Sequence, residues 1–244
     1  SGVNIGAYGR DLAAERSHPT LATLVESLLD ETDVPRLRLS SLEPWNLDAD
    51  LLAQWPHPRL CRQLHLPLQS GSDEVLRRMG RRSTVREYRS LVDAIRSRVP
   101  DVALTTDVIA GFPGESEADW QSTCTLVQEL GLARLHVFRF SARPGTPAAS
   151  FPHRVPVDVT QARARELSSL GSRLSRAYHA RFVGQKVTVL FEQQVTRNGV
   201  GGWLGLTDNY LHVWVPSEVQ LHNQMREVHC TGASGGELEG VLAE

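Results

Sequence analysis

HLPLQSGSDEVLRRMGRR (residues 65–82) and TTDVIAGFPGE (residues 105–115) are the two stretches that decide the fold of this chain. In each, an apolar run ends in a polar or glycine-rich corner, and a helical pattern follows. This order of strand, corner and helix predicts a parallel α/β sheet. The two corners then lie at the carboxyl ends of neighbouring strands, where parallel sheets bind ligands.

The same alternation extends on both sides of these stretches. Apolar or alternating runs predict four strands, at residues 36–41, 60–68, 102–110 and 135–140. Helical periodicity predicts six helices, at residues 20–29, 48–54, 73–79, 84–98, 116–130 and 158–182. Local signals support their ends, because Thr84 and Glu87 suit a capping box and Gly131 suits a helix terminus.

The pattern changes near residue 181. Short alternating segments separated by Gly and Asn turns fill the last part of the chain, namely KVTVLFE, GWLGLT, YLHVWVP and REVHCTG. They predict a small β-barrel. We therefore divide the chain into an α/β part (residues 1–155), a linking helix (156–180) and a β-barrel (181–244).

Composition excludes several classes of protein. The 244 residues are 41% hydrophobic and 22% charged, as in ordinary globular proteins. No run of about 18 apolar residues and no basic-then-apolar start is present, so we expect a cytoplasmic protein that is neither exported nor inserted in a membrane. The net charge of -2 gives no general attraction to nucleic acid, so RNA would need a local patch.

Cysteine and histidine spacing predicts no protein-bound metal. The three cysteines stand too far apart for a metal or redox motif and are expected to be reduced thiols: Cys61, Cys124 and Cys230. Three histidines lack helical i, i+4 pairing or a neighbouring carboxylate: His65, His136 and His153. Alternation places the first two of these histidines on strands.

Gln69 and Asp107 are the candidate ligand-binding residues of these two stretches. The Gln69 amide follows a strand, where it can bind a ribose hydroxyl as donor and acceptor or can cap its own turn. Asp107 lies in the apolar run LTTDVIAGF, where an unpaired carboxylate is costly to bury. Its partner is either a ribose diol of a ligand or an Arg or backbone donor of the fold.

Two further features stand beside these residues. Gly111 and Gly114 sharply end the strand predicted at residues 102–110 and let the backbone approach whatever lies above the sheet. A basic cluster ends the short helix before residue 84: Arg77, Arg78, Arg81 and Arg82. Such a cluster suits the helix dipole and solvent, or one arginine clamps a carboxylate or phosphate.

Taken in order, six motifs resemble the radical S-adenosylmethionine methylthiotransferases: VNIGAYGRD, LRLSSLEP, HLPLQSGSDEVLRRMGR, TTDVIAGFPGE, FRFSARPGTPA and GQKVTVLFE with LTDNYLHVWV. The resemblance covers nearly the whole chain. VNIGAYG and RLRLSSLEP are most similar to the branch that methylthiolates N6-threonylcarbamoyladenosine beside the tRNA anticodon. The resemblance implies strands three to six of a TIM-like radical SAM barrel, followed by a small, OB-like TRAM barrel.

As cofactors, the resemblance implies S-adenosylmethionine and four-iron four-sulfur clusters; as partners, it implies tRNA and a reductant protein. In the family, a cluster on a Cys-x3-Cys-x2-Cys loop cleaves S-adenosylmethionine to a radical that takes hydrogen from the adenine. A second cluster, on an amino-terminal domain, supplies the sulfur. This chain carries neither the loop nor that domain, so we expect a fragment that holds no cluster and is inactive by itself.

The family's roles, carried over by matched motif, fall on seven residues. Gln69 and Asp107 would bind the ribose hydroxyls, and Arg81 would bind the methionine carboxylate. The turn from Ile109 to Phe112, together with Phe138, would border the adenine. The remaining candidate, for the amino-acid end of the cofactor, is Ser41.

RNA binding by the terminal barrel would need more than charge. From Arg181 onward the chain has four basic and seven acidic residues. Contacts would then come from the Arg-rich linking helix or from aromatic residues, which could equally form the barrel core: Trp203, Tyr210 and Trp214.

Two other functions stay open. A sibling branch of the family would modify isopentenyladenosine in tRNA or an aspartate of a ribosomal protein. The missing cysteine loop would also suit a non-catalytic RNA-binding remnant.

Overall fold

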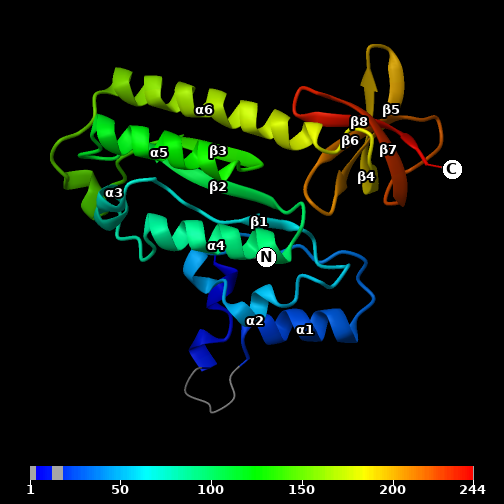
Figure 1. Cartoon of the computed structure of the whole chain (residues 1–244), viewed down its shortest axis with the longest axis horizontal. Helices are drawn as coiled ribbons and strands as arrows, with labels where there is room; N and C mark the ends of the chain where they lie inside the picture. Colours follow the sequence, from blue (N-terminus) through cyan, green and yellow to red (C-terminus); the bar gives the residue numbers. More distant parts are fainter. Residues whose placement is uncertain (1–3, 13–18, 244) are drawn as a thin grey trace. The chain divides into compact units, whose positions relative to one another are not determined.

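The computed structural model describes residues 4–12 and 19–243. The chain forms two compact units, residues 1–171 and 172–244 (Figure 1). The first unit contains a parallel sheet with helices, and the second contains a closed β-barrel. None of the described helices is long and apolar enough to cross a membrane.

A three-stranded parallel sheet in the order β1-β2-β3 forms the centre of the first unit. Its strands are β1 (Gln63–His65), β2 (Ala103–Ala110) and β3 (Arg134–Arg139). The helices are α1 (Leu21–Glu31), α2 (Ala49–Leu52), α3 (Asp73–Arg78), α4 (Val85–Arg98), α5 (Glu117–Leu130) and α6 (Val157–Ala180). Short 3-10 turns are η1 (Ile5–Ala7), η2 (Arg10–Leu12), η3 (Pro44–Asn46) and η4 (Pro147–Ser150). Because α3 and α4 connect β1 to β2 and α5 connects β2 to β3, the predicted α/β alternation is confirmed.

The described sheet has one strand fewer than the sequence predicts. Residues 36–41 pair with the neighbouring segment through a single bridge between Leu37 and Leu60. The predicted strand is therefore wrong. β1 is also shorter than residues 60–68, because Pro67 has no N–H to donate to the ladder. Pairing with β2 resumes at Gln69, which forms a bridge with Val108.

Local signals set the helix ends as predicted. The Thr84 hydroxyl accepts a hydrogen bond from the Glu87 N–H (3.2 Å), and the Glu87 carboxylate accepts one from the Thr84 N–H (2.7 Å). This is the capping box at the start of α4. Gly131 ends α5 in the left-handed region, at φ 52°.

The two faces of the sheet have different surroundings. One face, here the helix-packed face, carries Leu64, Leu104, Thr106, Val108 and Leu135, and the first four are at most 2% exposed. The Tyr88 hydroxyl of α4 donates to the Leu66 carbonyl (2.8 Å) on this side, and burial raises the pKa of Tyr88 to about 12. The opposite face, here the polar face, carries His65, Thr105, Asp107 and His136. Strand alternation thus separates packing residues from polar ones.

The second unit is a closed five-stranded barrel in the order β4-β5-β6-β8-β7. Its strands are β4 (Lys186–Arg197), β5 (Val200–Thr207), β6 (His212–Pro216), β7 (Met225–Ser234) and β8 (Glu237–Leu242). The predicted small barrel is confirmed, and β8 is an additional strand that the sequence analysis missed. β6 and β8 are parallel, whereas the other neighbours are antiparallel.

Two of the three aromatic residues singled out in the barrel are buried. Trp203 is 5% exposed and Trp214 is 9% exposed. The Trp214 indole N–H also donates to the Val195 carbonyl (3.3 Å). Tyr210 is partly exposed, so among the three it is the one with a side chain accessible to a partner.

Helix α6 confirms the predicted helix after residue 157. The division between the two units falls inside this helix, at Gly171. The predicted domain limits at residues 155 and 181 stay a prediction.

Candidate functional site

Gln69 is the strongest candidate for a ligand-binding residue in the first unit. Its φ of 69° lies in the left-handed region, which costs a non-glycine residue about 1–2 kcal/mol. Backbone bonds hold it there, since its N–H donates to the Asp107 carbonyl (2.8 Å) and its carbonyl accepts from the Ile109 N–H (2.9 Å). Its side-chain Oε1 is buried and has no hydrogen-bond partner among the described residues. A buried acceptor without a donor costs about 1–3 kcal/mol, which a ligand hydroxyl would recover.

Asp107 lies on the polar face, next to Gln69. Its Oδ2 is 3.3 Å from Nε2 of His65, so the partner is a histidine rather than the Arg or backbone donor considered above. The second ring nitrogen of His65 is 3.0 Å from the Thr105 hydroxyl, which fixes the orientation of the ring. The Asp107 side chain is 26% exposed, so the carboxylate can still accept hydrogen bonds from a ligand.

His136 extends this polar group onto β3. Its ring meets the His65 ring edge-on, with 5.8 Å between the centroids. Burial lowers the pKa of His136, and the nearby Arg134 lowers it further. The polar face therefore combines the Asp107 carboxylate with a His136 imidazole that is neutral at neutral pH.

Arg81 already has a carboxylate partner. Its guanidinium is bound by both oxygens of Glu43, at 3.3 and 2.8 Å, and also donates to the Pro67 carbonyl (3.2 Å). It lies over the Trp45 ring, 5.1 Å from the centroid. Its Nε is buried without a partner among the described residues. A methionine carboxylate would therefore have to share Arg81 with Glu43, a residue that the sequence analysis did not single out.

The other predicted site residues separate into two groups. Ile109 and Phe138 are register partners on neighbouring strands, and the Phe138 side chain is 52% exposed. Phe112 is 5% exposed and packs edge-on against Phe140, with 5.2 Å between the ring centroids. Ser41 is partly buried, two residues before Glu43. The structure thus brings Asp107, Ile109 and Phe138 onto one face and buries Phe112.

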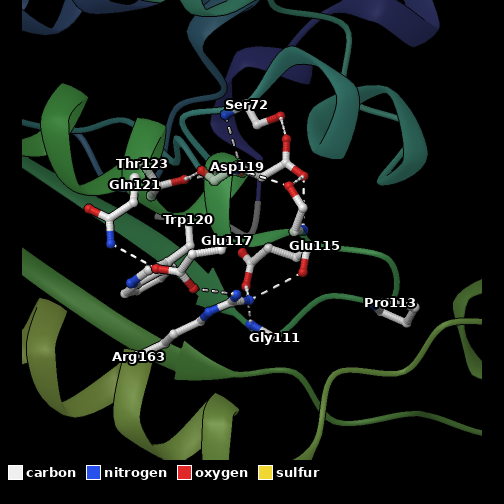
Figure 2. A network of polar contacts seen from close by, with 12 residues as sticks. Ser72, Gly111, Pro113, Glu115, Glu117, Asp119, Trp120, Gln121, Thr123 and Arg163 are labelled. Carbon is white, nitrogen blue, oxygen red and sulfur yellow. Dashed lines mark hydrogen bonds and ion pairs between the residues drawn. The ribbon is translucent and has the colours of Figure 1, made fainter.

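A buried ion pair that the sequence analysis missed holds the turn after β2 (Figure 2). The Glu115 side chain is 1% exposed; its Oε2 accepts from the Gly111 N–H (2.9 Å) and from Arg163 Nη1 of α6 (2.8 Å). Arg163 also binds the Glu117 carboxylate (3.0 Å). Burial raises the pKa of Glu115, although Gly111 and Arg163 oppose this shift. The pair ties the carboxyl end of β2 to α6.

Steric constraints fix the same turn. Gly111 has a φ of 78°, and a Cβ there would lie 2.2 Å from the Thr160 hydroxyl. Gly114 has a φ of 80°, and a Cβ there would lie 1.8 Å from Arg78, which donates to the Pro113 carbonyl (3.0 Å). Both positions require glycine, so the close backbone approach expected from the motif is observed within the protein itself.

The residues described do not fit an iron-sulfur cluster. Over residues 4–12 and 19–243, His, Cys, Asp and Glu form no group of three or more that could hold a metal ion. Cys61 and Cys230 are buried thiols. Burial raises the pKa of Cys124 and of Cys230 to about 11, which keeps both thiols protonated.

Comparison with known proteins identifies relatives of this chain. Residues 17–127 match the model of the Radical SAM superfamily. Over all 244 residues, the chain is 36% identical to threonylcarbamoyladenosine tRNA methylthiotransferase MtaB of Thermotoga maritima and covers 53% of that protein. The chain is a homologue of the radical S-adenosylmethionine methylthiotransferases. The chain is also 35% identical over 244 residues to tRNA-2-methylthio-N(6)-dimethylallyladenosine synthase of Erythrobacter litoralis, and it covers 54% of that protein.

The methylthiotransferase homologue spans about half the length of the curated relatives it matches. Among solved structures, it resembles Escherichia coli coproporphyrinogen III oxidase, which is described as a radical SAM enzyme. The TM-score is 0.51 at 16% identity, over 63% of this chain and 37% of the oxidase. At this identity, the likeness supports the fold of the chain and carries no statement about its function.

Proposed function

We propose that this chain forms the S-adenosylmethionine-binding part of an enzyme that adds a methylthio group to N6-threonylcarbamoyladenosine beside the tRNA anticodon. The unpartnered Gln69 Oε1 next to the accessible Asp107 carboxylate is the observation that carries the proposal. Two acceptors at the carboxyl end of parallel strands suit the two hydroxyls of a ribose. The name of the Thermotoga maritima relative supplies the nucleoside.

The candidate residues contact different parts of the cofactor in this proposal. Gln69 and Asp107 accept hydrogen bonds from the ribose hydroxyls, and His65 orients the Asp107 carboxylate. Ile109 and Phe138 border the adenine, and their register pairing on β2 and β3 supports this. Phe112 supports that border from the core beneath it.

The Arg81–Glu43 pair is the proposed site of the amino-acid end, with Ser41 beside it. Its two opposite charges complement a methionine carboxylate and ammonium group. When bound, S-adenosylmethionine would supply the hydrogen-abstracting adenosyl radical, and a second S-adenosylmethionine would supply the methyl group. The described residues hold no iron-sulfur cluster, so their part in the reaction is to bind and orient the cofactor.

We also propose which family domains the two units correspond to. The β1-β2-β3 sheet is part of the family's TIM-like barrel, and the closed five-stranded barrel is its TRAM barrel. Support comes from the order of motifs along the chain and from the radical SAM match over residues 17–127. The partners are tRNA and a reductant protein, and tRNA agrees with the expected cytoplasmic location.

Cofactor binding is tested on the chain itself by saturation-transfer NMR with S-adenosylmethionine. We expect transfer to the ribose and adenine protons, and a strong loss of it in Gln69→Ala and Asp107→Ala. Gln128→Ala, an exposed glutamine of α5, is the matched control and should retain the signal. Wild-type transfer in both site variants would overturn the assignment of these residues. Absence of any transfer would favour the non-catalytic remnant.

The substrate is tested by mass spectrometry of nucleosides from tRNA. A strain without the gene should lose the methylthio derivative of N6-threonylcarbamoyladenosine, and the gene in its native reading frame should restore it. The gene carrying Asp107→Ala should not. Loss of the methylthio derivative of an isopentenyl-type adenosine would instead assign the sibling branch, whose relative is almost equally similar.

A further inference from the structure

A hollow between β3 and α6 is a cationic feature that lies outside the proposed cofactor site. Its volume is about 960 Å³, and it is lined by residues of the turn after β2, of β3 with its following loop, and of the first half of α6. We call it the β3–α6 hollow. Three arginines line it: Arg139, Arg154 and Arg165. Its lining contains no aspartate or glutamate.

The three arginines come from three different elements. Arg139 ends β3, Arg154 lies in the loop before α6, and Arg165 lies on α6. All three side chains are exposed, and none forms an ion pair within the described part of the chain. Arg154 donates to the Ala149 carbonyl (2.6 Å), which holds its guanidinium in place while leaving other N–H groups available.

The distribution of charge along the sequence also indicates a positively charged surface at the hollow. The whole chain has a net charge of -2, yet residues 134–171 contain six arginines and two carboxylates. Of these arginines, Arg163 is neutralised by Glu115 and Glu117. Guanidinium groups gathered around one space without a carboxylate repel each other, and a polyanion would relieve that repulsion.

The position of the hollow connects it to the cofactor site. Phe138 is a lining residue of the hollow and is also the register partner of Ile109, which borders the polar face. Strand β3 therefore borders both the hollow, on the side of α6, and the proposed adenine site, on the polar face. The terminal barrel offers little alternative attraction, because acidic residues outnumber basic ones from Arg181 onward.

We propose that the β3–α6 hollow binds the phosphodiester backbone of RNA through Arg139, Arg154 and Arg165. Guanidinium groups suit this ligand because their planar donors bind phosphate oxygens in pairs. The inference rests on the proposed function for the identity of the polyanion as RNA. It adds the surface of this chain that holds the substrate.

Fluorescence anisotropy with a labelled 12-nucleotide single-stranded RNA tests the proposal on the 244-residue chain. Single substitutions of the three arginines to alanine should each weaken binding several-fold, and the triple variant should weaken it about tenfold or more. Each removed phosphate contact should also reduce the slope of log affinity against log salt by about 0.7. Arg98→Ala, an exposed arginine of α4 outside the hollow, makes the same change of charge and should have little effect.

Four outcomes would overturn the proposal. They are no RNA binding by the wild type, wild-type affinity in the triple variant, an equal loss in Arg98→Ala, and full competition by inorganic phosphate at the phosphate concentration of the RNA. Thermal melting by circular dichroism confirms that the variants are folded. S-adenosylmethionine transfer measured on the same samples separates the two hypotheses. If the arginine variants lose RNA binding but retain saturation transfer from S-adenosylmethionine, the RNA site at the hollow is supported. If the chain binds RNA through the hollow but shows no transfer from S-adenosylmethionine, only the proposed function is contradicted.

Discussion

On the helix-packed face of the sheet, Leu64, Leu104 and Val108 are at most 2% exposed, whereas on the polar face His65 and Asp107 keep 18% and 26% of their side chains exposed. Both sets of residues alternate along the same short strands. The helix-packed face has its hydrophobic contacts completed within the first unit. The polar face retains hydrogen-bonding capacity that a ligand can use. Strand alternation thus lets β2 specify the fold with one set of residues and bind with the other.

Breaking the buried ion pair between Glu115 and Arg163 should have the largest effect on stability. Glu115→Ala leaves the buried Arg163 guanidinium with only the exposed Glu117 carboxylate as ion-pair partner, which should lower the free energy of unfolding by about 3–5 kcal/mol. Urea denaturation measures this loss. The double variant Glu115→Leu with Arg163→Leu should recover a large part of it. A double variant as unstable as the single one would show that the pair fixes the turn through specific bonds that apolar packing does not replace.

Removing apolar volume from the helix-packed face should cost somewhat less. Leu104→Ala should lower the free energy of unfolding by about 2–5 kcal/mol, because Leu104 is 2% exposed and its removal leaves a cavity. In conditions where the variant remains folded, saturation transfer from S-adenosylmethionine should persist. Loss of transfer in folded Leu104→Ala would show that the two faces are not independent.

A substitution on the polar face should reverse this pattern. Asp107→Asn keeps the shape of the side chain but removes its charge, so the free energy of unfolding should change by about 1 kcal/mol or less. Hydrogen bonds to a charged group contribute about 1.5–3 kcal/mol, so S-adenosylmethionine affinity should fall about 10- to 100-fold. Titration by NMR measures the affinity, and urea denaturation measures the stability. A large loss of stability with unchanged affinity would assign Asp107 to the fold alone.

The smallest effect concerns pH, and it should differ in sign between the faces. Tyr88, on the helix-packed side, has a pKa of about 12, so the unfolded chain loses this proton first and stability should fall above about pH 10, by about 1 kcal/mol at pH 11. His136, on the polar face, has a lowered pKa, so the unfolded chain binds this proton first and stability should fall below about pH 6.5. Tyr88→Phe and His136→Gln should each flatten one side of the profile. An unchanged profile in either variant would contradict its assignment.

Sequence patterns predicted the elements that depend on neighbouring residues. The Thr84 and Glu87 capping box lies within one turn, and Gly131 ends a helix by its own conformation. The strand predicted at residues 36–41 failed because a strand exists only through its partner, and this segment makes a single bridge. β8 was missed because its short run, ELEGVL, has little hydrophobic alternation, although Gly235 and Gly236 signal the hairpin before it.

The candidate site could be predicted in part for the same reason. Gln69 follows from its place after an apolar run, and Asp107 follows from its place within one. Their partners do not, because the contact between His65 and Asp107 depends on the register of two strands. The pairs Arg81–Glu43 and Arg163–Glu115 join residues 38 and 48 positions apart, which no local pattern reports.

The pairing of β7 in the terminal barrel has a further consequence. β4 begins opposite His229 and β8 ends opposite Val228, so both ends of the barrel flank the same part of β7. Strands on the two sides of a third are about 10 Å apart, a gap that a linker of a few residues spans. The barrel is therefore suited to circular permutation, with Ala243 joined to Lys186 and new termini at the Asn198-Gly199 turn. As a unit with adjacent ends, it could also be transferred into a loop of another protein without stretching its host.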